Sequence, residues 1–410
     1  MSKQQSRPNI TVIVLDTLRQ DAFEELTGME GESLAELGNF TTLGKCIAPS
    51  PWTLPSHASL FTGMYPSEHG SHESKTVKAL DIGKISLKKK TLVGDLNALG
   101  YSTYAISANP YVHPVYGFDE FKSFKEESYF TDMWGSVVEV SAKLKPMFAK
   151  YRERYGSGLT SSLVKIPLAT LAEDPGLFVE GVASGLALTP VAAAKKLKAK
   201  LVDNWPLEKG GKRIVRAVKE MELREPSFLF LNLMEAHDPY TDSKKTALNW
   251  ATPFLKKPVD EKTIELWRNL YQKAAHKAYG YAYDIIENLV ERFGDNQIIL
   301  LTSDHGQEFN EHGFLGHGAA LHDEIVRVPM SVLLPRRFST DARSGYSSLV
   351  NVRKFILNAI AGKEDALNSL YSKEVRAESF GVVTSLSGRK DIDQRKLKAY
   401  EKTTVRRFRQ

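Results

Sequence analysis

The sequence predicts an α/β fold in which helices cover both faces of a mostly parallel sheet. Two observations lead to this prediction. Short apolar runs such as residues 9–15 (NITVIVL) are nearly continuous, as in strands buried on both faces. Longer segments with helical periodicity lie between these runs, which is typical of a parallel sheet with helical connections. With 410 residues, the chain has room for two domains or for one large α/β domain with insertions.

The elements follow one another in a regular order. The helix expected at 55–61 has Pro55 in its first turn and Thr53 near its cap, and the helix at 92–99 ends at Gly100. The long amphipathic helix at 264–293 is expected to be interrupted near Gly280. The remaining expected elements are a helix at 17–26 and strands at 9–15, 101–107, 227–234, 297–302 and 330–334.

The pattern changes between residues 122 and 224, where the chain is rich in Lys and Ala and shows no clear strand. We therefore expect residues 1–121 and 225–363 to form the α/β core, 122–224 a mainly helical insertion or cap, and 364–410 a small C-terminal region. Within the insertion, residues 187–205 place basic side chains beside an apolar face. A helical cap is the preferred interpretation, and an interfacial membrane helix is the alternative.

The positive charge is concentrated at the C-terminus. Lys and Arg total 55 against 49 Asp and Glu, a net charge of +6. Residues 389–410 hold nine basic and three acidic side chains, so the rest of the chain is neutral. The preferred interpretation is a solvated terminal segment. Peripheral contact with an anionic membrane is the alternative, and nucleic acid is not expected as a partner.

Cys46 is the only cysteine, which excludes an internal disulfide and a zinc site built on several thiolates. The polar residues before the first strand contain no apolar signal core, and no apolar run approaches the ~18 residues of a membrane span. We therefore expect a cytoplasmic protein.

Polar clusters follow three of the predicted strands. Asp16 comes directly after the first strand, residues 303–306 (SDHG) follow 297–302, and residues 235–240 (EAHDPY) follow 227–234. Ligands of open α/β sheets bind beyond the carboxyl ends of the strands. Two carboxylates and an imidazole from distant strands are suited to a divalent metal with oxygen and nitrogen ligands. A hydroxyl at a helix N-terminus, that of Thr53, would complete such a site.

Several of these segments together resemble the sulfatase family of the alkaline phosphatase superfamily. The resemblance extends over about residues 8–335, and residues 53–70 (TLPSHASLFTGMYPSEHG) are its most specific part. It implies an alkaline phosphatase-like three-layer sandwich and a metal-dependent hydrolase of phosphoric or sulfuric esters. The other matching segments, in chain order, are residues 8–19, 117–119, 237–240, 303–306, 311–313 and 327–329.

The nucleophile position departs from the sulfatase pattern. Sulfatases convert a Cys or Ser to formylglycine in a Cys-x-Pro-x-Arg context, whereas this chain has Thr53 and His57 there. Threonine would give a ketone, so no formylglycine is expected. Thr-x-Pro-x-His is similar to nucleotide pyrophosphatase/phosphodiesterases, and some transferases of the superfamily also use threonine. The resemblance thus favours phosphate mono- or diester hydrolysis through a covalent Thr53 intermediate. A sulfuric ester hydrolase, a phosphoryl-group transferase acting on a lipid or glycan, and a non-catalytic anion-binding relative are the alternatives.

The resemblance also implies a role for each site residue. His237 and His317 contact the transferred group, one of them as general acid, and His317 stands where many sulfatases have a catalytic lysine. Arg19 either meets an anionic substrate or pairs with a surface acid, and His57 is expected to be structural. The residues expected to hold one divalent metal are Asp16, Thr53, Asp304 and His305.

The cofactor and partners follow from the same site. Zn²⁺ or Mn²⁺ is favoured over Mg²⁺ or Ca²⁺ because Thr and His replace Asp and Asn in the ligand set. One metal is preferred, although His237, Asp238 and His317 leave room for a second. The expected substrate is a small-molecule, glycan or lipid ester, and the sequence does not indicate an oligomeric state.

Overall fold

The computed structural model describes residues 7–28, 33–74, 87–112, 114–124, 172, 209–240, 248–341 and 345–409. Contacts divide the chain into two compact units, a core unit of residues 1–124 and 208–410 and a second unit of residues 125–207. Apart from residue 172, every described residue belongs to the core unit. The amphipathic stretch 187–205 lies outside the described residues.

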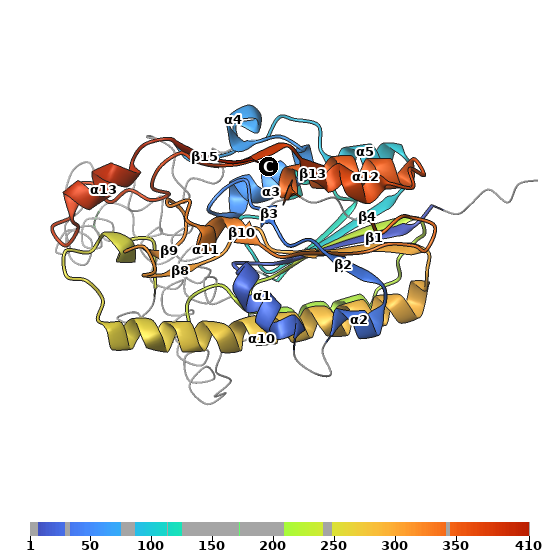
Figure 1. Cartoon of the computed structure of the whole chain (residues 1–410), viewed down its shortest axis with the longest axis horizontal. Coiled ribbons are helices and arrows are strands. Elements are labelled where there is room, and N and C mark those ends of the chain that lie inside the picture. Colours follow the sequence, from blue (N-terminus) through green and yellow to red (C-terminus); the bar gives the residue numbers. More distant parts are fainter. Residues whose placement is uncertain are drawn as a thin grey trace, which may run out of the picture. The chain divides into compact units, whose positions relative to one another are not determined.

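A seven-stranded sheet crosses the core unit in the order β2-β11-β7-β1-β6-β4-β5 (Figure 1). Strand β11 pairs antiparallel with β7 and β2, and the pairings of β7, β1, β6, β4 and β5 are parallel. This confirms the predicted mostly parallel sheet. The strands are β1 (Asn9–Leu15), β2 (Phe40–Thr42), β4 (Ser102–Ser107), β5 (Glu120–Ser123), β6 (Ser227–Leu233), β7 (Gln297–Thr302) and β11 (Met330–Leu333).

Helices cover both faces of this sheet, as a three-layer sandwich requires (Figure 1). Side chains of a strand alternate between faces, so Ile13 and Leu15 of β1 join one apolar core while Val12 and Val14 join the other. The first core includes α1 (Gln20–Thr27), α2 (Leu34–Leu37), α9 (Gly211–Glu220) and α10 (Glu261–Phe293). The second includes α3 (Thr53–Thr62), α5 (Leu92–Ala98) and α12 (Val352–Ile360), and α4 (Pro66–His69) follows α3.

Helix α10 is continuous, so the predicted interruption near Gly280 is wrong. A Cβ atom at Gly280 would have no neighbour within 4 Å, and the glycine therefore costs only its backbone entropy, about 1 kcal/mol. The buried stripe from Ile264 to Leu289 and the Asp260 cap, which accepts from the Thr263 amide at 3.0 Å, offset that cost. None of the described helices is long and apolar enough to cross a bilayer.

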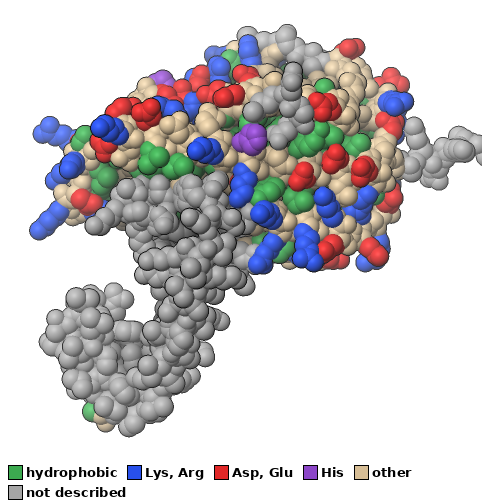
Figure 2. Space-filling model, turned by 90° about the horizontal axis from the view of Figure 1, so that it is seen from below, with side chains coloured by type: hydrophobic (Ala, Val, Ile, Leu, Met, Phe, Trp, Pro, Cys, Tyr) green, Lys and Arg blue, Asp and Glu red, His purple; other side chains and the backbone are tan. Residues whose placement is uncertain are grey.

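The basic C-terminal segment is folded, and most of its side chains are exposed to solvent, as the sequence predicts. Strand β15 (Thr404–Arg409) pairs antiparallel with β14 (Glu374–Ser379), and Phe408 is buried. Glu374 pairs with Arg407 and with Arg409, the latter at 2.6 Å. Basic side chains nevertheless gather at the end of the core unit that carries α13 (Gln394–Tyr400), as Figure 2 shows.

The remaining elements are short, and most of their strands form two smaller sheets. A four-stranded sheet has the order β10-β3-β12-β13, and β8 pairs with β9. Their bounds are β3 (Cys46–Ile47), β8 (Glu308–Phe309), β9 (Leu315–Gly316), β10 (Arg327–Val328), β12 (Tyr346–Ser348), β13 (Tyr371–Ser372) and α11 (Asp323–Val326). Short 3₁₀ helices span Pro114–Tyr116, Thr252–Phe254, Leu349–Asn351 and Ala366–Leu370.

The chain leaves the core unit and returns to it at neighbouring points. At the exit, the Phe124 amide donates to the Ser107 carbonyl at 2.9 Å. At the return, a Cβ atom placed on Gly210 would lie 3.5 Å from the Phe124 Cβ. Helix α9, inside the range 122–224 expected as an insertion, packs on α10 in the core unit.

Candidate active site

Four neighbouring strands bring polar side chains to one edge of the sheet. Asp304 follows β7, Asp16 follows β1, His237 follows β6, and Asn109 follows β4. The register is level, because Val14 of β1 lies opposite the last residue of β7 and the penultimate residue of β6. The ends of these parallel strands therefore converge on one place, where the sequence predicted a site.

Three predicted ligands form a first cluster. Asp16, Asp304 and His305 each offer one ligand atom, and the three atoms lie within 4.8 Å of one another. His305 Nε2 is 3.5 Å from Asp304 Oδ2 and 3.9 Å from Asp16 Oδ1. All three side chains are fully buried.

The protein holds each ligand from behind and leaves one atom facing the centre. Asp16 Oδ2 accepts from Asn109 Nδ2 at 2.6 Å, and Asp304 Oδ1 accepts from the His305 amide at 3.0 Å. The facing oxygens, Asp16 Oδ1 and Asp304 Oδ2, are buried without a hydrogen-bond partner. Such atoms are costly unless a cation satisfies them, so these residues fit a divalent metal.

Electrostatics supports the same interpretation. Burial and the neighbouring charge of Asp16 raise the pKa of Asp304 well above its usual range, because two carboxylates are buried close together. Burial lowers the pKa of His305 to about 4, so the ring is neutral at pH 7. His305 Nδ1 donates to the Gly306 carbonyl at 3.0 Å, which leaves the Nε2 lone pair toward the cluster.

Thr53 lies against this cluster as the first residue of α3, next to the cap residue Trp52 and so near the cap, as the sequence predicts. Thr53 Oγ1 is 3.3 Å from His305 Nε2 and 3.4 Å from Asn109 Nδ2. The first-turn amides of a helix have no intrahelical acceptor and favour negative charge. His57, one turn later, donates from Nδ1 to the Thr53 carbonyl at 2.9 Å, and burial lowers its pKa.

The turn that positions Asp16 has an unusual backbone. Thr17 has φ 61°, a left-handed conformation that is rare for a β-branched residue and costs about 1–3 kcal/mol. Several bonds hold it: its amide donates to Asp304 Oδ1 at 3.3 Å, and its carbonyl accepts from the Tyr271 hydroxyl at 3.0 Å. These bonds offset the strain, and the first of them joins the turn after Asp16 to Asp304.

A second cluster lies beside the first and consists of His237, Asp238 and His317, whose ligand atoms are also within 4.8 Å of one another. The His317 ring centroid is 4.5 Å from that of His305 and 5.0 Å from that of His237. This cluster is slightly more open, with exposed fractions of 7–9%. Neither Asp238 oxygen is among the buried, unpartnered atoms of the described residues.

Hydrogen bonds fix the two histidine rings of this cluster. His237 Nδ1 donates to the Asp238 carbonyl at 2.6 Å, and Asp238 Oδ1 lies 3.4 Å from the same nitrogen. His317 Nδ1 donates to Gln307 Oε1 at 2.6 Å. Burial, together with the charges of His305 and His237, lowers the pKa of His317 well below its usual value, so its ring is neutral at pH 7.

Sequence reasoning missed Lys209, which lies against the second cluster. The side chain is 3% exposed, and its ammonium donates to the His237 carbonyl and lies 5.9 Å from the Tyr240 ring centroid. Burial lowers the pKa of Lys209 to about 8, opposed by attraction to Asp238. Nothing in the Lys-rich stretch before α9 marks this lysine as different. Asn109 was missed as well, since no motif surrounds it.

Arg19 joins neither cluster. Its guanidinium pairs with Asp21 at 2.6 Å and with Glu311 at 2.7 Å, and it also donates to the Gln307 carbonyl at 3.2 Å. Of the two roles that the sequence left open, this geometry corresponds to the pairing with acids.

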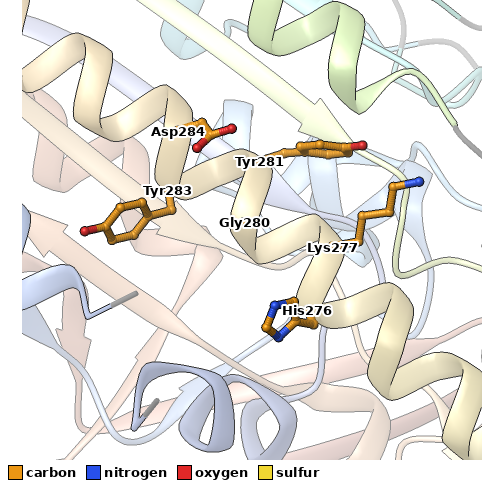
Figure 3. A pocket seen from close by; sticks show the side chains of 6 residues that line it. All are labelled: His276, Lys277, Gly280, Tyr281, Tyr283 and Asp284. Atoms are coloured by element: carbon orange, nitrogen blue, oxygen red, sulfur yellow. The ribbon is translucent and has the colours of Figure 1, made fainter. Parts of the chain in front are cut away.

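A hollow of about 290 Å³ lies on α10 (Figure 3), and none of its described lining residues belongs to either cluster. The Lys277 ammonium lies 5.8 Å from the Tyr281 ring centroid there. The described lining residues are His276, Lys277, Gly280, Tyr281, Tyr283 and Asp284.

Comparison with known proteins gives a consistent result. The sequence pattern of the sulfatase family matches residues 8–362. The phosphonate monoester hydrolase of Agrobacterium radiobacter superposes with a TM-score of 0.56 at 12% identity, covering 97% of this chain and 85% of that one. The enzyme SpPMH of the same kind, from Silicibacter pomeroyi, gives 0.53 at 15% identity, covering 91% and 80%. A 2-O GAG sulfatase gives 0.54 at 12% identity, covering 91% and 78%.

At these identities the solved structures show a shared fold, whereas the match to the family pattern shows family membership. No curated protein matches the sequence. The family pattern spans most of the chain, including both strand-end carboxylates and Thr53. The chain belongs to the sulfatase family.

Proposed function

We propose that this protein is a metal-dependent hydrolase of phosphate mono- or diesters that works through a covalent intermediate on Thr53. The main support is the position of Thr53 Oγ1, at the start of α3 and beside two buried carboxylates that each have one unpartnered oxygen. A sulfatase mechanism through formylglycine needs a Cys or Ser at this position. The only cysteine, Cys46, is fully buried in β3. Sulfate ester hydrolysis is therefore the less favoured activity.

Asp16, Asp304 and His305 would hold the metal, with the Thr53 hydroxyl next to it. When bound, a divalent ion lowers the pKa of a neighbouring hydroxyl and offsets the negative charge of the transferred group. Two carboxylates, an imidazole and a hydroxyl suit Zn²⁺ or Mn²⁺ better than Ca²⁺.

The reaction has two steps, the formation of the Thr53 intermediate and its hydrolysis, and residues of this chain act in both. In the first, Thr53 Oγ gives its proton to solvent and forms a bond to phosphorus, while the bond to the leaving alcohol breaks and the alcohol oxygen takes a proton from the general acid. The first-turn amides of α3 favour the negative charge there. In the second, water gives a proton to the spent general acid and attacks phosphorus, the bond to Thr53 breaks, and Thr53 Oγ regains a proton from solvent.

His237 is the better candidate for the general acid that protonates the leaving oxygen. The Asp238 carboxylate lies 3.4 Å from its ring and provides opposite charge when the ring is protonated. His317, neutral and oriented by Gln307, instead provides an acceptor for a hydrogen bond from a protonated oxygen of the substrate.

The test is an activity panel with nitrophenyl phosphate, bis-nitrophenyl phosphate and nitrophenyl sulfate, each with Mn²⁺, Zn²⁺, Mg²⁺, Ca²⁺ or a chelator. We expect phosphate ester turnover that the chelator removes and that falls by about 10⁵-fold or more in Thr53→Val. Thr53→Ser keeps the hydroxyl and should retain measurable turnover. Mass spectrometry of the quenched wild type should find a phosphoryl group on the peptide containing Thr53. Turnover of the sulfate ester alone, or normal turnover in Thr53→Val, would contradict the proposal.

A further inference from the structure

A cation lies beside the second cluster, since the Lys209 ammonium contacts the backbone carbonyl of His237. We propose that Lys209 keeps the His237–Asp238–His317 cluster from binding a second divalent metal, so that the active site holds a single ion in the first cluster. This inference rests on the proposed function for the identity of the first metal site. It assigns to Lys209 a positioning role that acts through charge.

The charges of the two clusters differ. The first cluster combines two carboxylates with a neutral imidazole, and among the described residues no Lys or Arg donates a hydrogen bond to either carboxylate. The second combines one carboxylate with two imidazoles, and the Lys209 ammonium contacts the His237 carbonyl within it. A divalent ion entering the second cluster would meet a like charge in a buried site, where such repulsion is strong.

The backbone keeps this ammonium in place. Lys209 directly precedes Gly210, the cap of α9, and the Gly211 amide donates to Glu235 Oε1 at 2.8 Å. A Cβ atom on Gly211 would lie 2.2 Å from the Tyr281 ring, so this segment packs tightly on α10. The side chain is 3% exposed, and swinging it into solvent would require this packed junction to open.

Protonation of the leaving group by His237 also depends on the exclusion of a second metal by Lys209. In both histidines of the cluster, Nδ1 donates to a protein oxygen, so a metal would be bound through Nε2. That nitrogen of His237 is the one that would carry the proton for the leaving group. By excluding a metal, Lys209 leaves His237 available as an acid.

The experiment counts metal ions. Wild type, Lys209→Met and Lys209→Arg are dialysed against Zn²⁺ at pH 7, and bound zinc is measured by elemental analysis and by titration calorimetry. We expect one ion per chain in wild type and in Lys209→Arg, and two in Lys209→Met, with the Kd of the second ion lowered on the order of 100-fold. Lys277→Met, which removes a nearby charge outside the cluster, is the matched control and should keep one ion.

Further variants locate the second ion and guard against misfolding. Adding His317→Ala to Lys209→Met should remove the second ion and leave the first. Lys209→Gln replaces Lys209→Met if its circular dichroism spectrum departs from that of wild type. Two ions of equal affinity in wild type, or an unchanged second Kd in the folded Lys209 variant, would overturn the inference.

The proposed function is tested separately from this inference by Asp304→Asn, which should remove the first ion. If this variant loses the ion but still hydrolyses phosphate esters, the proposed function fails and the ion counts for Lys209 still stand.

Discussion

The two clusters at the carboxyl edge of the sheet contain the same residue types, yet their surroundings differ. The first has two fully buried carboxylates with unpartnered oxygens, while the second has one carboxylate, two oriented histidines and a buried lysine. Strand ends deliver the ligands of both. Their neighbours differ: the neutral amide of Asn109, after β4, donates to Asp16 in the first cluster, whereas the charged Lys209, before α9, donates to the His237 carbonyl at the second. Position in the fold therefore predicts where a site lies, and the surrounding charges determine what it binds.

The largest effect should come from the first cluster. Asp16→Asn removes one of the two facing charges and should weaken metal binding enough to lose several kcal/mol of transition-state stabilisation, on the order of 10³-fold in kcat/KM. Turnover of nitrophenyl phosphate with a metal titration measures this. Full activity at ordinary metal concentration would show that the first cluster is not the metal site.

A smaller effect is expected from the second cluster. His237→Gln should lower kcat by about 10²–10⁴-fold for an ester with a poor leaving group, because the general acid is lost. For a nitrophenyl ester, which leaves without protonation, the loss should be much smaller. The ratio of the two losses is the measurement, and equal losses would indicate that His237 binds substrate or metal instead.

The residues behind the clusters allow a matched comparison. Asn109→Ala removes the 2.6 Å bond to Asp16 and should lower metal affinity by about 10–100-fold. Gln307→Ala removes the 2.6 Å bond to His317 and should lower kcat while leaving the metal Kd unchanged. Calorimetry and steady-state kinetics on both variants check this. A lowered metal affinity in Gln307→Ala would mean that the second cluster also binds a metal.

The smallest expected effect concerns the segment that carries His317. The hydrogen bond to Glu308 at 2.5 Å raises the pKa of His322 above its usual 6.5. A raised pKa stabilises the fold fully below pH about 6.5, and this stabilisation is lost as the pH rises through the folded-state value. Since His322 is partly exposed, the difference in unfolding free energy between wild type and His322→Gln should shrink by only about 0.5 kcal/mol between pH 6 and pH 8.5. Urea titrations at both pH values measure it, and a difference that grows with pH would contradict the assignment.

Much of the fold and the first cluster could be predicted because the signal is local. The apolar run 9–15 announces a buried strand, and the polar residue that ends it, Asp16, lies at the sheet edge. The same holds for residues 297–302 and Asp304. Once the strands are known to be parallel, their ends must meet, so spacing in the sequence becomes nearness in space.

The features that were missed depend on contacts between distant segments. From the sequence alone, β15 is predicted as part of a basic terminal segment. It forms a strand by pairing with β14, and Phe408 is buried there. In the sequence, nothing distinguishes Lys209 from the many other lysines. Its place near β6 depends on the packing of α9 on α10. The sequence around Thr17 does not predict its left-handed backbone, since the hydrogen bonds that stabilise this conformation come from the end of β7 and from α10. No local pattern encodes such partners.

The closeness of Phe124 and Gly210 has a consequence for how such a protein can change during evolution. Because the two ends of the intervening segment lie side by side, closing this segment into a loop costs little conformational entropy. That cost rises only slowly with the length of the segment. A lineage could therefore exchange residues 125–207 for a longer domain or a short turn without redesigning the sheet. The fixed requirement at that junction is the pair of glycines after Lys209, where Gly211 has no room for a side chain.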